Sequence, residues 1–152
     1  MPLNPQKLAK DIEVISASGG ADWNAICDAI ADYAFQGQFP PPIGVKKGLD
    51  AIKPLLNSIT PGMGPKAPKI LSNAFMILGT FIMTGMPIGT GLGPTKMPPS
   101  GPNFDAVFKG PQDAKQFSQN LAREIDTWMR KGKFDVGFIG GSGPVVIYVS
   151  WM

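Results

Sequence analysis

The sequence predicts a mainly α-helical domain of four or five helices, joined by long glycine- and proline-rich loops and followed by a carboxyl-terminal β-hairpin. Three observations lead to this prediction. Apolar residues recur at helical spacing in several segments up to residue 132. Glycine (19) and proline (16) residues separate these segments. From residue 133 on, apolar residues alternate in two short runs around a glycine-rich turn, which is typical of a β-hairpin.

The length and the charge content bound the organisation of the chain. At 152 residues it has the length of one ordinary domain, so that we expect a single domain over 1–152. Charged residues make up only 16% of the chain, against about 25% in ordinary soluble domains, and much of the surface is therefore expected to face something other than water. The parts of the domain are a helical part (1–84), a wrapping glycine- and proline-rich loop (85–110), a long helix (111–132) and the hairpin (133–152).

Two short amphipathic helices are predicted before residue 38. The first follows Asn4, which can cap it, has Pro5 at its first position and ends before the glycines at 19 and 20. The second begins at Asp22 and ends at Gly37. Its apolar stripe consists of Trp23, Ile26, Ile30 and Tyr33.

Two further helices are predicted, over residues 49–59 and 70–83. A weaker pattern runs from Leu49 to Ile59, with Pro54 as its start or as a kink. The most apolar run, Ile70 to Met83, is shorter than the ~20 apolar residues of a transmembrane helix and is interrupted by polar residues. We interpret it as a central buried helix, and a membrane-active segment stays open as the alternative.

The loop and the tail are the expected binding regions. The loop carries isolated apolar residues that a free linker would not need, and Pro111 then begins what the pattern predicts as the longest helix, ending at Gly132. A hairpin alone is marginal in water and its last strand is an edge, so we expect loop and hairpin to bind other chains. The expected partner-binding residues are Ile88, Leu92 and Phe104 in the loop and Val145, Ile147, Val149 and Trp151 in the hairpin.

No motif for catalysis, a cofactor or a metal emerges. The chain has no histidine, the commonest general base near neutral pH and the commonest metal ligand. Asp28 and Asp32 lie four residues apart on one helix face, which we interpret as a solvated face. The single cysteine, Cys27, is expected to be a small buried hydrophobe. We therefore expect no catalytic, cofactor-binding or metal-binding residue and no enzymatic activity.

The stretch Phe117–Met129 (FSQNLAREIDTWM), which closes on Gly132, resembles a pattern of small virion proteins of tailed bacteriophages. In these proteins a capped amino-terminal helix and a helix with aromatics, here Trp23 and Tyr33, precede a middle rich in small residues and a near-terminal Ile-Asp-x-Trp-Met helix. The resemblance implies a particle component present in many copies, with no catalytic residues. This chain departs from the pattern in its more apolar middle and its long hairpin, so the choice between head and tail stays open.

These observations together predict a structural component of a phage virion, either a head decoration or minor capsid protein or a tail or baseplate component, acting by protein–protein packing. Its expected partners are other virion proteins or copies of itself, with no small-molecule substrate and no membrane. The net charge of +3 and the scattered basic residues argue against nucleic acid as a main partner. Lys7 and Lys10 are not followed by an apolar core, so we expect synthesis in the host cytoplasm without a signal peptide. The alternative function is a membrane-active helical protein that uses residues 70–83.

Overall fold

The fold within the described residues is mainly helical, as predicted. The computed structural model describes residues 3–17, 22–35, 42–60, 63–84, 95–98, 100–108, 113–135, 139–140, 143–144 and 148–150. In these ranges it contains five α-helices and a 3-10 helix, η1 (Asp105–Phe108). The α-helices are α1 (Pro5–Ser16), α2 (Trp23–Phe35), α3 (Pro42–Asn57), α4 (Lys66–Thr84) and α5 (Ala114–Arg130).

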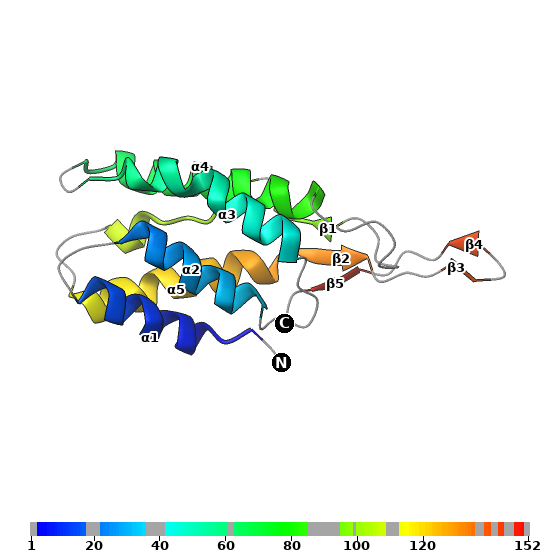
Figure 1. The fold of residues 1–152 in the computed structure, drawn as a ribbon, viewed down its shortest axis with the longest axis horizontal. Helices are drawn as coiled ribbons and strands as arrows, with labels where there is room; N and C mark the ends of the chain where they lie inside the picture. Colours follow the sequence, from blue (N-terminus) through cyan, green and yellow to red (C-terminus); the bar gives the residue numbers. More distant parts are fainter. Residues whose placement is uncertain are drawn as a thin grey trace.

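The five helices pack along one another around a shared apolar core (Figure 1). α1 lies along α5, α3 lies along α4, and α2 contacts both α1 and α3. Every α-helix contributes fully buried apolar side chains to the core, and all five therefore belong to the same packed unit. Examples, one from each helix in order, are Ile12, Ile26, Leu56, Leu78 and Ile125.

Side-chain caps define where α1, α2 and α5 begin. Asn4 and Asp22 each accept a hydrogen bond from the main-chain amide three residues on, at 3.0 and 3.2 Å. At α5, Asp113 accepts from the Gln116 amide at 2.7 Å, and the Gln116 side chain accepts from the Asp113 amide, which completes a capping box. The beginnings predicted for α1 and α2 are confirmed, whereas α5 begins after the predicted Pro111.

α3 begins at Pro42 rather than at the predicted Leu49. Proline suits the first position of a helix because the amide that it lacks would have no partner there. The pattern missed the first turns because they contain glycine, which lowers helix propensity. Gly48 lies where α3 and α4 approach closely, since a Cβ at this position would lie 2.6 Å from Cδ1 of Leu78 and 3.0 Å from Cβ of Phe81. Pro54 lies inside the helix, near its end.

α4 is an amphipathic helix at the surface, which corrects the prediction of a central buried helix. With 19 residues it is also longer than α5, with 17, which was predicted to be the longest. Its outer face exposes Met76 (42%) and Ile77 (40%) together with Asn73 and Thr80. The inner face packs into the core through Leu71, Ala74, Phe75, Leu78 and Ile82.

No helix within the described ranges has the length and apolar character needed to cross a membrane.

The segment after the short strand β1 (Thr95–Lys96) is fixed between α4 and α5 by close contacts (Figure 1). The indole nitrogen of Trp128 donates a hydrogen bond to the main-chain oxygen of Ser100 at 2.9 Å. At Gly101 a Cβ would lie 1.9 Å from the main-chain oxygen of Ser72, so only glycine permits this approach. Neither contact could be predicted from local patterns, because both depend on residues far apart in the chain.

The described residues also contain five short strands, of which β1 precedes α5 and the other four follow it. They are β1 (Thr95–Lys96), β2 (Lys133–Asp135), β3 (Ile139–Gly140), β4 (Gly143–Pro144) and β5 (Tyr148–Ser150). β2 lies between β1 and β5 in an antiparallel sheet, and β3 pairs with β4. Strand β1 was not predicted, since its two residues owe their conformation to pairing with β2. The remaining residues of the predicted hairpin, 136–138, 141–142, 145–147 and 151–152, lie outside the described residues, and the hairpin as a whole stays a prediction.

Candidate interaction surfaces

The structure describes two of the seven predicted partner-binding residues, Phe104 and Val149. Phe104 is a correction: it is 1% exposed, and its ring contacts Phe75 edge to face with centroids 5.3 Å apart. An apolar residue in a glycine- and proline-rich loop has the same sequence signature whether it anchors on its own chain or on another, and here it belongs to the internal core. Ile88, Leu92, Val145, Ile147 and Trp151 lie outside the described residues.

Val149 belongs to the edge strand β5. Its main chain lies opposite Phe134 of β2, and β2 has β1 on its other side. In the sheet formed by the described residues, β5 is therefore an outer strand. An outer strand presents main-chain donors and acceptors that a further strand can use.

A groove of about 460 Å³ separates the outer sides of α1 and α5. Its small apolar residues include Ala9 from α1 and Ala122 from α5, which is 1% exposed. Its polar lining combines charges of both signs and two amides, from Gln6, Lys10, Glu13, Gln119, Arg123 and Asp126. Sequence reasoning missed this groove because it depends on the pairing of two helices from opposite ends of the chain. The only sequence feature that pointed to the groove was an alanine beside the apolar stripe of each helix, Ala9 in α1 and Ala122 in α5.

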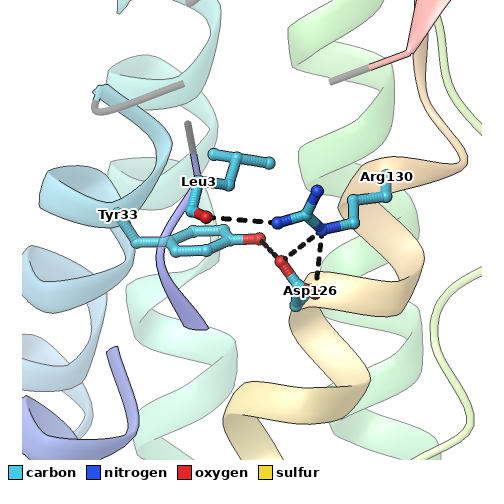
Figure 2. Close-up of polar contacts among 4 residues, drawn as sticks. All are labelled: Leu3, Tyr33, Asp126 and Arg130. Carbon is cyan, nitrogen blue, oxygen red and sulfur yellow. Dashed lines mark hydrogen bonds and ion pairs between the residues drawn. The ribbon is translucent and has the colours of Figure 1, made fainter. Parts of the chain in front are cut away.

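A polar cluster at one end of this groove joins α2, α5 and the start of the chain (Figure 2). The Tyr33 hydroxyl donates a hydrogen bond to Oδ1 of Asp126 at 2.6 Å, and Nε of Arg130 donates to both oxygens of the same carboxylate at 2.9 Å. Arg130 also donates from Nη2 to the main-chain oxygen of Leu3 at 3.1 Å. Burial, reinforced by the hydrogen bond to Asp126, raises the pKa of Tyr33 above its ordinary value. Tyr33 therefore stays a neutral donor well into the alkaline range.

The cluster is built for holding helices together. Asp126 accepts hydrogen bonds from Tyr33 and Arg130 and is 17% exposed, while the Arg130 side chain is 39% exposed. At that exposure solvent screens the ion pair, so its contribution to stability is reduced to about 0.5–1 kcal/mol. The buried tyrosine hydrogen bond contributes a similar amount, about 1 kcal/mol.

A second hollow, of about 240 Å³, lies between α2 and α3 and contains Cys27. The thiol residue is 1% exposed, and burial raises the pKa of Cys27 to about 12. Lys53 spans the mouth, with Nζ at 3.2 Å from Asp50 and 3.8 Å from Asp28. A neutral, covered thiol is a poor nucleophile, so the prediction of a small buried hydrophobe is confirmed.

The predicted carboxylate pair of α2 faces solvent. The Asp28 side chain is 78% exposed, and Asp32 is exposed as well. This confirms the interpretation of a solvated helix face. Among the described residues there is no group of three or more acidic, cysteine or histidine side chains placed to hold a metal ion.

Comparison of the chain with protein-family models, with curated proteins and with solved structures finds no match in any of the three.

Proposed function

We propose that this protein is a non-enzymatic structural component of a multi-copy assembly, and that the assembly is a phage virion. The observation that carries the proposal is the position of β5 at the edge of the described sheet. The sequence through this strand alternates apolar residues at Val145, Ile147, Val149 and Trp151. An apolar outer strand near the carboxyl terminus provides both main-chain pairing and side-chain burial for a neighbouring chain.

The register of the short strands supports a single carboxyl-terminal hairpin as the binding element. Phe134 lies opposite Val149, and Ile139 lies opposite Pro144. The two pairs share one register, as expected for two parts of the same hairpin. Figure 1 draws β3 and β4 beyond β2 and β5, away from the helices. Main-chain groups of strands in that position can be reached by another chain.

Two features of the helical part favour packing over catalysis. The polar cluster around Asp126 is occupied by contacts between its own helices and the start of the chain. The described hydrophobic surface includes Val14, 68% exposed, as well as Met76 and Ile77. The membrane-active alternative is not favoured, since the apolar face of α4 packs against its own chain.

The virion part of the proposal rests on the resemblance of Phe117–Met129. Leu121, Ile125 and Trp128 of this stretch are buried in the core, so the motif carries the packing of α5 rather than a site. The proposal takes the role of a virion component from this sequence resemblance alone. Head and tail locations are both compatible with this role.

Removal of the terminal strand tests the proposal. A chain ending after Gly143 is expected to lose assembly while its circular dichroism keeps the helical signal, because the described helices and their core precede residue 133. Loss of the helical signal together with assembly would contradict the proposal, since the hairpin would then belong to the internal core. A finer pair uses the full chain: Val149→Thr keeps the β-branched shape and removes apolar character, and Val149→Ile keeps both. Only the threonine variant is expected to weaken assembly.

A further inference from the structure

The polar rim of the α1–α5 groove carries opposite charges one helical turn apart. Lys10 and Glu13 lie three residues apart on α1, and both line the groove. Within the described part of the chain, neither side chain has a hydrogen-bond or ion-pair partner. On the facing helix, Arg123 donates to Asn120 at 3.0 Å and lies 3.8 Å from Glu124.

Beside Lys10, α1 also exposes an apolar side chain. Val14, at 68%, is the most exposed of the large hydrophobic residues that the structure describes, and it follows Lys10 by four residues, so the two are neighbours on the helix surface. Ala9 in the groove is small enough to let another helix approach closely. This face therefore offers a short apolar contact flanked by one free cation and one free anion within the described residues.

The balance of charges favours one kind of occupant. A strongly acidic partner would meet Glu13, and a strongly basic partner would meet Lys10. Asp126 adds no free charge because Arg130 pairs with it. A patch that carries both signs side by side complements itself when a second copy is turned by a twofold rotation, which is the geometry of an isologous contact.

We infer that this face binds a second copy of the same chain, with the two α1 helices antiparallel across a twofold axis near residues 10–14. This inference rests on the proposed assembly function and names one of its contacts. Lys10 of each copy then pairs with Glu13 of the other, and the aliphatic part of each Lys10 covers Val14 of the other copy. One helix pair buries less than the ~1,200 Å² of a standard stable interface, so the contact is weak alone and gains strength from multiple copies.

Charge reversal in the full-length chain tests the contact. Lys10→Glu and Glu13→Lys each place two like-charge pairs across the axis, so either variant alone is expected to raise the dimer dissociation constant about tenfold or more. An equal mixture of the two variants restores both opposite-charge pairs, and so does the double variant carrying both substitutions. Sedimentation velocity up to about 100 μM covers the weak affinities expected for a small contact. Lys47→Glu makes the same charge change on an exposed residue of α3 and is expected to leave the dissociation constant unchanged.

Restored association in the mixture supports the inference. It is overturned if the mixture stays as weak as the single variants, if both reversals associate like the unmodified chain, or if the unmodified chain stays monomeric. Circular dichroism of every variant shows whether the helical content is retained. If assembly persists in the charge variants but is weakened by Val149→Thr, the inference fails and the proposed function stands.

Discussion

The Tyr33 hydroxyl and the Asp126 carboxylate, 93 residues apart in sequence, form a 2.6 Å hydrogen bond that joins α2 to α5. Both α2 and α5 begin at local caps, but nothing local fixes how they sit against each other. This hydrogen bond and the adjacent Arg130 pair provide polar fixation in addition to the apolar contacts. The cluster also holds the main chain at Leu3, before the start of α1.

Substitution of Asp126 is expected to destabilise the fold more than substitution of Tyr33. Tyr33→Phe removes one hydrogen bond and should lower the free energy of unfolding by about 1 kcal/mol. Asp126→Ala leaves the tyrosine hydroxyl and the arginine without their acceptor and should cost about 2–3 kcal/mol. Urea unfolding measures both values. The double variant should cost less than the sum of the two, and strict additivity would show that the pair is not coupled.

Alkaline pH is expected to lower stability through Tyr33 and Cys27. Their folded-state pKa values lie above the ordinary values of 10.0 and 9.0, so folding favours the protonated forms. Their contribution is complete below these ordinary values and declines as the pH rises through and above them, because the unfolded chain loses its protons first. Urea unfolding at about pH 7 and about pH 10.5 should show the decline. Tyr33→Phe should make it shallower, and an unchanged pH dependence would count against the burial of Tyr33.

Cys27 is expected to resist thiol reagents in the folded protein. Its residue is 1% exposed and its pKa is raised to about 12, so the thiolate fraction near neutral pH is negligible. Reaction with an aromatic disulfide at about pH 8 should require opening of the α2–α3 contact and should become fast in urea. A cysteine placed at exposed Met76 in a Cys27→Ala background serves as the reactive control. Equal rates for the two cysteines would contradict the burial.

Phe104 is expected to stabilise the fold of its own chain. Phe104→Ala should lower the free energy of unfolding by about 3–5 kcal/mol, because a buried ring is lost from its contact with Phe75. Met76→Ala removes an exposed side chain and should change stability by no more than about 0.5 kcal/mol. Thermal and urea unfolding compare the two variants. If Phe104→Ala unfolds like the unmodified chain, the ring does not hold the loop in place.

Local signals predicted much of the helical part. The beginnings of α1 and α2 followed from Asn4 and Asp22, since a capping side chain acts within three residues of itself. Features that depend on distant residues were missed, such as the pairing of β1 with β2 and the close approach of Gly101 to α4. The exposed face of α4 was missed because it carries the apolar residues Met76 and Ile77, so the sequence pattern does not separate the exposed face from the buried one.

Among the candidate surfaces, too, those that depend on local patterns were predicted and those that depend on distant residues were missed. The edge strand containing Val149 was expected from alternation, a local pattern. The groove was not expected, because Lys10 and Arg123 come together only when α1 lies along α5. Phe104 was predicted to bind a partner because an apolar residue in a loop is expected to be buried, and the sequence does not show whether it is buried against its own chain or against another.

The mass of the full-length protein in solution is the most direct test of assembly by self-packing. Light scattering after size exclusion, with circular dichroism on the same peak, gives mass and fold together. The expected result is a helical protein whose mass rises with concentration from 16.1 kDa to at least twice that value. A helical protein that remains at 16.1 kDa at every concentration would contradict the proposed contact between copies.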